Sequence, residues 1–208
     1  MRYNEYINTI TGFCLKYGYN QSAVERHLAK GETLSEVIQE LPDSQTRIKK
    51  RLESLLFMAS VHIREYRTYC IKMHQPDFAE YIHAISGKKY SIQMISSVEN
   101  GRKIFSLDVL IALAKHSNSS LDWFLGVSKS RKAYDEAPTD HTWNEQLEYM
   151  MQYRHISEKE LLSKLENMGF KKVNLKKPKA KTLIALAEIL ETSTDFLVGM
   201  TDTVSPAK

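Results

Sequence analysis

The sequence lacks the features that mark exported, membrane-spanning and disulfide-stabilised proteins. No apolar run approaches the length that crosses a bilayer. The opening residues, MRYNEYINTI, do not place an apolar core after a positive segment, as a signal peptide does. The two cysteines, Cys14 and Cys70, are far apart and form no spaced pair, which predicts reduced thiols. We therefore expect a cytoplasmic protein with no membrane partner.

The residue patterns of metal sites and of common enzymes are also missing. The seven histidines are scattered, and no two of them stand at metal-ligand spacing beside other ligands. There is no glycine-rich phosphate loop, no Walker pattern and no Ser/His/Asp set. The sequence therefore predicts a protein that is not an enzyme and that holds no cofactor and no metal.

What the chain does have is the composition of a globular protein and an uneven distribution of charge. Hydrophobic residues make up 42% and charged residues 26% of its 208 residues. The net charge of +4 divides into +1 for residues 1–60, +5 for residues 61–132 and −2 for residues 133–208. Positive charge concentrated in the middle third favours a polyanionic partner.

Apolar residues recur at helical spacing along nearly the whole chain, and glycine and proline stand between these stretches. This pattern predicts an all-α protein. The elements expected near the N-terminus are helices over 3–17 and 21–30, a capping box from Thr33 to Glu36, and a long helix that starts after Asp43 or Ser44 and extends to about Lys72.

An internal repeat divides the rest of the chain. Ser106–Gly126 (SLDVLIALAKHSNSSLDWFLG) aligns without a gap with Lys179–Gly199 (KAKTLIALAEILETSTDFLVG) at an offset of 73 residues. Each copy holds a helical LIALA stretch, and then a Ser-x-Asp that begins a second short helix, with the serine and aspartate as expected N-terminal caps. The repeat predicts two copies of one helical module, roughly residues 60–132 and 142–202.

The middle copy is expected to contain five helices: Ile63–Lys72, Pro76–Ser86, Ser91–Asn100, Ser106–His116 and Leu121–Val127. Proline at the first position of a helix loses no hydrogen bond, and serine is a favoured N-cap. A helix, a short turn and a second helix form the arrangement that can place the second helix in the major groove of DNA.

These residues carry a resemblance to a known family. IREYR, QPDFAEYI, SIQMISSVENGRK and SLDVLIALAKHSNSSLDWFLG follow one another over about 65 residues. Together they resemble the phage-repressor (Cro-like, XRE-like) helix-turn-helix transcriptional regulators, with S-x-x-x-I-S-x-V-E-N-G as the most specific part. The resemblance implies tandem five-helix, lambda-repressor-like modules, the second one degenerate, preceded by a small N-terminal helical module.

The resemblance also implies roles for individual residues. Gln75 opens the second helix and would bind a phosphate or a base. Arg67 and Glu99 would form a charged pair between the first and third helices. The base-facing positions are Ser91, Gln93, Met94 and Ser97, and the positions that reach phosphates are Asn100, Arg102 and Lys103.

The chemistry of the third helix agrees with these roles. Ile95 and Val98 can hold the helix to the core while Gln93 points outward, where its amide can pair with adenine N6 and N7. Ser97 is small enough to let a groove floor approach. Beyond the helix, Arg102 and Lys103 project positive charge where phosphates would pass.

The chain departs from the family between the second and third helices, where HAISGKKYS is longer than the usual connection. Lys88 and Lys89 fall in this extra length. They are candidate phosphate contacts, but a solvated turn, or an insertion that tilts the third helix away from DNA, explains them equally well.

The C-terminal copy lacks the ENG signature and has GFKKVNLKKPKAK in its place, with six lysines and no acid between Lys171 and Lys181. We slightly favour a second DNA contact here over a solvated loop on a dimerisation domain. Its candidate residues are Lys171, Lys172, Asn174, Lys176 and Lys177. The N-terminal segment around Gln21–Lys30 also faintly resembles a small helix-turn-helix, although a helical cap or dimerisation element is the favoured interpretation.

The sequence thus predicts four regions: an N-terminal helical module (1–44), a connecting helix with the first helix-turn-helix module (45–132), a linker (133–141) and a second, degenerate module (142–208). The predicted function is that of a double-stranded DNA-binding transcriptional regulator, a repressor of phage or mobile-element origin. It could act as a homodimer, or one chain could cover both halves of an asymmetric site. The alternative is a protein-binding antagonist (an antirepressor, antitoxin or phage inhibitor) that reuses the fold.

Overall fold

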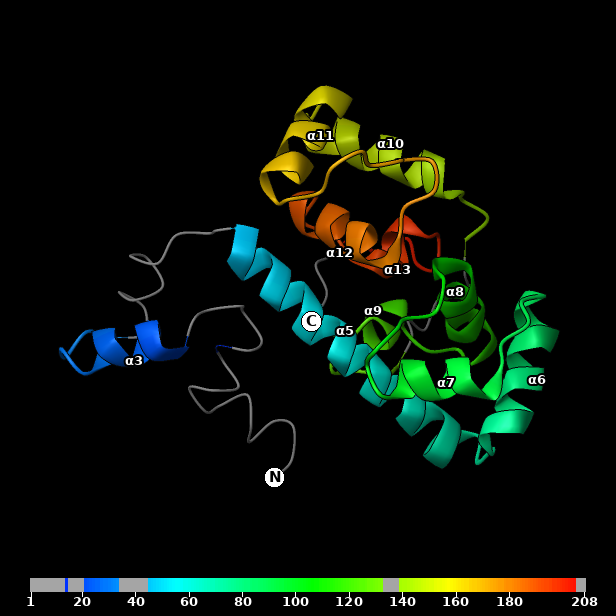
Figure 1. Cartoon of the computed structure of the whole chain (residues 1–208). Helices are drawn as coiled ribbons and strands as arrows, with labels where there is room; N and C mark the ends of the chain where they lie inside the picture. The colour runs from blue at the N-terminus through cyan, green and yellow to red at the C-terminus, as the bar shows by residue number, and fades with distance from the viewer. Residues whose placement is uncertain (1–13, 15–20, 34–44, 133–138, 205–208) are drawn as a thin grey trace. The chain divides into compact units, whose positions relative to one another are not determined.

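The computed structural model describes residues 14, 21–33, 45–132 and 139–204. These residues form ten α-helices, one π-helical turn and no β-strand, so the expected all-α class is confirmed for them (Figure 1). No helix among them is both long and apolar enough to cross a membrane. The chain divides into two compact units: Met1–Leu55 with Asn167–Gly169, and Leu56–Glu166 with Phe170–Lys208.

The first unit contains the helix α3 (Gln21–Leu28) and the start of α5 (Gln45–Glu65). Helix α3 corresponds to the helix expected over 21–30, and it buries Val24. Of the expected helix over 3–17 only Cys14 is described, and it is helical and buried. Most of the Thr33–Glu36 capping box and the expected caps at Asp43 and Ser44 lie outside the described residues.

In the second unit, the middle segment (residues 56–132) contains the end of α5 and five further elements. They are η1 (Tyr66–Cys70), α6 (Gln75–Ser86), α7 (Ile92–Glu99), α8 (Leu107–His116) and α9 (Leu121–Phe124). The four later α-helices lie where the sequence predicts them. The expected helix over 63–72 differs, because it is the end of the longer α5 and widens into a π-turn in which the amide of Ile71 donates to the carbonyl of Tyr66.

Helix α6 packs against α7 and α8 and forms the core of the middle segment. Phe78 and Ile82 from α6 are fully buried, as are Ile95 from α7 and Leu110 from α8. Each such side chain contributes about 1.5–3 kcal/mol relative to exposure. Helix α6 ends at Gly87, whose positive φ of 69° continues the chain in the left-handed conformation that glycine tolerates.

The C-terminal segment (residues 139–166 and 170–204) contains α10 (Trp143–Tyr153), α11 (Glu158–Asn167), α12 (Ala180–Ile189) and α13 (Thr194–Leu197). Helices α12 and α13 begin and end 73 residues after α8 and α9, so the sequence repeat is also a structural repeat over these elements. No helix lies between α11 and α12, where the middle segment has α7 between α6 and α8.

The middle and C-terminal segments meet where α9 contacts α13, and every residue of both short helices is buried. Ser120 and Ser193 cap their own helices, as the sequence predicts: each hydroxyl accepts a hydrogen bond from the backbone amide three residues later. The repeated aspartates, Asp122 and Asp195, do not behave as expected, because each accepts hydrogen bonds from the other copy's helix instead of its own.

The carboxylate of Asp195 accepts hydrogen bonds from the amide of Leu121 (2.7 Å), the amide of Asp122 (3.2 Å) and the hydroxyl of Ser120 (2.6 Å). In return, the carboxylate of Asp122 accepts from the amide of Thr194 (2.9 Å) and from its hydroxyl (2.5 Å). Each carboxylate therefore satisfies amides at a helix N-terminus that have no partner within their own helix, which is where negative charge is favoured.

Burial raises the pKa of both aspartates, and the pKa of Asp122 reaches about 7 because the neighbouring Asp195 carboxylate also disfavours a second negative charge. The bonds from Thr194 act in the opposite direction on Asp122. We call this group of Ser120, Asp122, Thr194 and Asp195 the aspartate clasp.

Candidate nucleic-acid interface

Helix α7 is fixed to the protein by one face only. Ile95 and Val98 have no exposed surface, and Glu99 is 6% exposed. Gln93 and Ile92 on another side of the helix are exposed, and Met94 and Ser97 are half-buried. The anchoring role predicted for Ile95 and Val98 is therefore confirmed, and the helix presents to its surroundings a surface that combines the polar Gln93 with the apolar Ile92.

The start of α7 is held by its cap. Ser91 has an extended backbone, and its hydroxyl oxygen accepts a hydrogen bond from the amide of Met94 at 3.2 Å. Farther along, the hydroxyl of Ser97 donates to the carbonyl of Gln93 at 2.8 Å. Because this hydroxyl already has a partner within the helix, Ser97 offers small size more than a free hydrogen-bonding group. The amide of Gln93 is the larger polar group on this surface.

The expected charged pair between Arg67 and Glu99 is present. The guanidinium of Arg67 donates to both carboxylate oxygens of Glu99, at 2.5 and 3.0 Å, and also to the carbonyl of Met73 at 2.7 Å. Gln75 donates its side-chain amide to the same carboxylate at 2.8 Å. Glu99 therefore ties the end of α7 to the beginning of α6, and the NH₂ group of Gln75 is engaged in this network.

The chain after α7 turns sharply and then carries two exposed cations. The side-chain amide of Asn100 donates to the carbonyl of Ser96 at 2.8 Å and closes the helix. Gly101 follows with a φ of 70°, and a Cβ atom there would lie 3.1 Å from the Phe57 ring of α5. Arg102 and Lys103 come directly after this turn, and both are exposed.

The connection from α6 to α7 is held by Tyr90, whose ring lies 5.0 Å from that of Phe105 in an edge-on arrangement. Lys88 and Lys89 precede it and are exposed. Lys88 lies at 4.0 Å from the carboxylate of Asp108, with both side chains more than half exposed, so this pair is loose.

In the C-terminal segment, the lysines predicted as a second contact lie on the connection between α11 and α12. Lys171, Lys172, Lys176 and Lys177 are exposed. The connection is attached at its centre, because the indole N–H of Trp143 donates to the carbonyl of Leu175 at 2.6 Å. Asn174 accepts a hydrogen bond from the amide of Lys176 at 2.9 Å and so shapes the loop. Sequence reasoning did not identify Trp143 as the residue that holds this connection.

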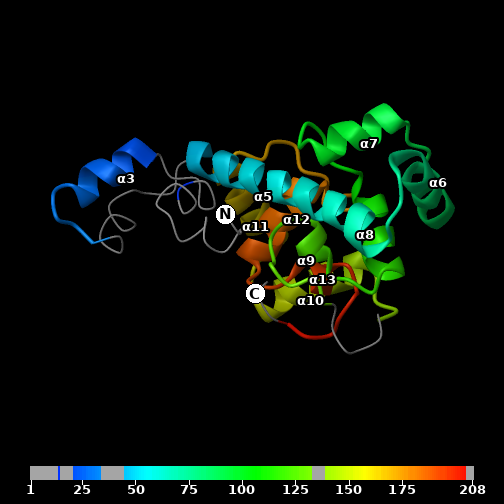
Figure 2. The same cartoon turned by 90° about the horizontal axis from the view of Figure 1, so that it is seen from below.

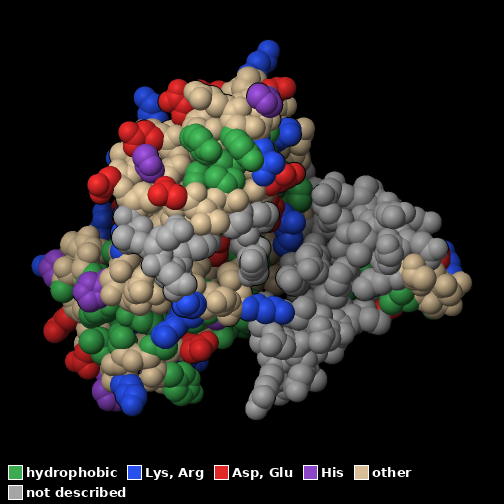
Figure 3. All heavy atoms as spheres, turned by 180° about the vertical axis from the view of Figure 1, so that it is seen from behind, with side chains coloured by type: hydrophobic (Ala, Val, Ile, Leu, Met, Phe, Trp, Pro, Cys, Tyr) green, Lys and Arg blue, Asp and Glu red, His purple; other side chains and the backbone are tan. Residues whose placement is uncertain are grey.

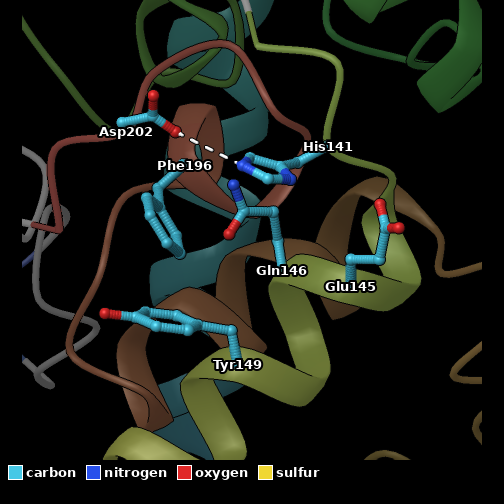
Figure 4. A pocket seen from close by; sticks show the side chains of 6 residues that line it. All are labelled: His141, Glu145, Gln146, Tyr149, Phe196 and Asp202. Carbon is cyan, nitrogen blue, oxygen red and sulfur yellow. Dashed lines mark ion pairs between the residues drawn. The ribbon is translucent and has the colours of Figure 1, made fainter.

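The structure also contains a pocket that the sequence did not indicate. It has a volume of about 440 Å³ and lies beside α10 and α13 (Figure 4). Its lining residues are His141, Glu145, Gln146, Tyr149, Phe196 and Asp202. His141 and Asp202 face each other across it at 4.0 Å. None of these residues is among the predicted contact residues, and no group of metal-ligating side chains occurs among the described residues.

Comparison of the chain with protein-family models, with curated proteins and with solved structures finds no match. The geometry of the site and the resemblance of the sequence motifs are therefore the two indications of function.

Proposed function

We propose that the protein is a sequence-specific, double-stranded DNA-binding transcriptional regulator that reads the major groove with α7. The observation that carries this proposal is the arrangement of α7: one face is anchored through Ile95, Val98 and Glu99, another side exposes Gln93 beside the apolar Ile92, and Arg102 and Lys103 follow at once. Action as a repressor, and an origin in a phage or mobile element, are the parts of the proposal that rest on the sequence resemblance alone.

In this proposal, α7 lies between the two sugar-phosphate walls of the groove. Gln93 pairs with an adenine edge, and the small Ser97 lets the groove floor approach the helix. Arg102 and Lys103 hold phosphates and set the position of the helix without reading sequence. Lys88 and Lys89 stand just before the helix and can add phosphate contacts on the other side.

A direct test begins by selecting bound duplexes from a random pool and by including the DNA upstream of the protein's own coding region. Binding of the selected duplex and of a random duplex is then measured at two salt concentrations. We expect Gln93→Ala to cost about 1–3 kcal/mol on the selected duplex and little on the random one. Arg102→Ala should weaken both about equally, because it removes a phosphate contact.

Gln152→Ala is the matched control, because Gln152 is an exposed glutamine on α10, away from α7. It should leave both affinities unchanged. If Gln93→Ala lowered the affinity for the two duplexes equally, this would contradict the proposed base-reading role of Gln93. Absence of duplex binding even at low salt would overturn the proposed function as a whole.

A specific observation favours the second candidate, a protein-binding antagonist. Tyr149 and Tyr153 on α10 are 48% and 55% exposed, and their rings stack at 6.0 Å. Figure 3 shows hydrophobic side chains gathered in the upper part of the molecule, where α10 and α11 lie, with acidic side chains around them. Exposed aromatic pairs suit protein partners. This function predicts weak salt dependence and binding that tolerates Gln93→Ala.

A further inference from the structure

The contacts in the aspartate clasp are related by exchange of the two repeat copies. The offset of 73 residues pairs Leu121 with Thr194 and Asp122 with Asp195. The amide of Leu121 donates to Asp195, and the amide of Thr194 donates to Asp122. Residue i therefore contacts residue j in both directions, which is the relation that defines a two-fold, isologous interface between identical subunits. Here both sides of that interface belong to one chain.

This interface is complete within the chain. Leu121, Phe124, Leu125 and Leu197 have no exposed surface, and Trp123 and Phe196 are each 3% exposed. The polar atoms that face one another across it are also engaged, as the bonds of the aspartate clasp show. A second chain could use this surface only after the middle and C-terminal segments had separated.

The two candidate DNA contacts lie on the same side of the second unit. In Figure 2, α7 and the connection that follows α11 both run along the upper side, while α10 and α13 lie below them. In Figure 1 the same two elements are well separated along the vertical direction. The connection also occupies the place in the repeat that α7 occupies in the other copy, since it directly precedes α12 as α7 precedes α8.

We propose that a single chain forms both halves of the DNA-binding unit: α7 reads bases in one half of an asymmetric site, and Lys171, Lys172, Lys176 and Lys177 hold phosphates in the other. This inference rests on the proposed function and specifies its partner as a non-palindromic duplex bound by one chain. The asymmetry follows from the C-terminal copy, which has a non-helical, lysine-bearing connection where the middle copy has α7.

The proposal has a geometric consequence that distinguishes it from binding by one helix alone. Two-fold related modules in helix-turn-helix dimers contact half-sites about 10 base pairs apart on one face of the duplex. The single chain should therefore protect two patches of DNA backbone with about this spacing. Base substitutions should matter only in the patch that α7 occupies.

The first experiment measures the stoichiometry of the complex on the selected duplex by light scattering after size exclusion, together with a hydroxyl-radical footprint. We expect one chain per duplex and two protected patches, with base-substitution effects confined to one of them. Two chains on a symmetric site, or protection of a single patch, would overturn the inference and leave the proposed function standing.

The second experiment compares two double variants of the full chain. Lys171→Ala with Lys172→Ala removes two positive charges from the connection, and Lys159→Ala with Lys164→Ala removes two from exposed positions on α11. The slope of log affinity against log salt should fall by about 2 for the first pair, about 1 per lysine. It should stay unchanged for the control pair.

The two experiments separate the possible failures. Equal slopes for the two lysine pairs would contradict the phosphate role of the connection, even where Gln93→Ala still abolishes sequence preference. Loss of all duplex binding in the wild-type chain at low salt would overturn the inference and the proposed function together. Circular dichroism at the start of each titration excludes unfolding as the cause of a lost contact.

Discussion

Glu99 shows how one buried carboxylate can position a whole recognition surface. Its side chain is 3% exposed and receives hydrogen bonds from Arg67 and Gln75, so it joins η1, α6 and α7 at one point. A buried charge is tolerated because it is paired, and removing one partner leaves the other without compensation. The orientation of Gln93 and of the cations after α7 therefore depends on a residue that touches no DNA in the proposed complex.

This dependence predicts that Glu99→Ala lowers the free energy of unfolding by about 3 kcal/mol, because Arg67 is left buried without its partner. Glu80→Ala is the control on α6, where Glu80 is exposed, and it should change stability by less than about 0.5 kcal/mol. Urea denaturation followed by circular dichroism measures both. Similar midpoints for the two variants would show that the ion pair contributes little.

Gly101 and Gly87 offer a comparison between two glycines with nearly the same backbone. Their φ values are 70° and 69°, so alanine is strained at both by about 1–2 kcal/mol. Only at Gly101 would the added Cβ also press on a neighbour, the ring of Phe57 at 3.1 Å, whereas space at Gly87 is open. We expect Gly101→Ala to destabilise the protein more than Gly87→Ala.

The contribution of the Phe57 contact is measured by a double-mutant cycle in urea denaturation. Adding Phe57→Ala should recover part of the loss in Gly101→Ala and none of the loss in Gly87→Ala. If both glycine variants lose the same amount and neither responds to Phe57→Ala, the close approach of α5 to the end of α7 has no energetic consequence.

At the scale of helices, local chemistry was enough to place most of the ends. The Ser91 cap, Pro76 in the first turn of α6 and the glycine turns at Gly87 and Gly101 act within a few residues of themselves, and the sequence shows them directly. The π-turn after α5 was not predicted, because its widened hydrogen bonding carries no residue pattern that differs from an ordinary helix.

The contact between α9 and α13 makes the stability of the folded protein depend on pH. The pKa of Asp122 is raised from 3.8 to about 7 by burial and by the neighbouring Asp195 carboxylate. A raised pKa in the folded state means that folding favours the protonated form. The contribution of this group to stability is therefore complete below about pH 4 and is lost as the pH rises through 7.

Asp122→Asn tests the direction of this pH dependence. The asparagine amide retains a hydrogen-bond donor toward Asp195 and an acceptor for Thr194, but it does not ionise. We expect the wild-type protein to lose stability relative to Asp122→Asn between about pH 4 and pH 7, as measured by urea midpoints. Asp108→Asn, at an exposed site on α8, should follow the wild type at every pH.

His62 must be considered in the same titration, because its contribution to stability changes with pH in the direction opposite to that of Asp122. Burial lowers the pKa of His62, although its hydrogen bond to the carbonyl of Trp123 and the charge of Glu65 oppose this. Its neutral form is favoured in the folded state, so its contribution is lost as the pH falls through the lowered value. The raised pKa of Asp122 would be contradicted if stability plotted against pH were identical for the wild type and Asp122→Asn, with a decline only at acid pH.

At the scale of the whole molecule, the sequence repeat predicts two similar helical segments but not how they join. The bonds of the aspartate clasp connect residues 72 to 75 positions apart. A Ser-x-Asp pattern is equally compatible with each aspartate capping its own helix, as we expected from the sequence. Only the packing of α9 on α13 decides which amides the carboxylates reach, and packing between distant elements leaves no local signal.

The shared interface predicts that the middle and C-terminal segments unfold together. Each segment holds one of the chain's two tryptophans, Trp123 on α9 and Trp143 on α10. Trp143→Phe leaves a reporter of the middle segment, and Trp123→Phe leaves a reporter of the C-terminal segment. Leu161→Ala, at a fully buried site on α11, should cost about 2–5 kcal/mol because it opens a cavity.

In the Trp143→Phe protein, the reporter Trp123 lies in the middle segment, whereas Leu161→Ala lies in the C-terminal segment. We nevertheless expect the Trp123 fluorescence transition in urea to shift as far as the Trp143 transition does, because the buried faces of α9 and α13 cannot be exposed separately. Glu166→Ala, at an exposed site on the same helix, should shift neither. A Trp123 transition that stays at its wild-type midpoint while that of Trp143 moves would mean that the two segments unfold independently, and the clasp would then be too weak to hold a single chain across two halves of a DNA site.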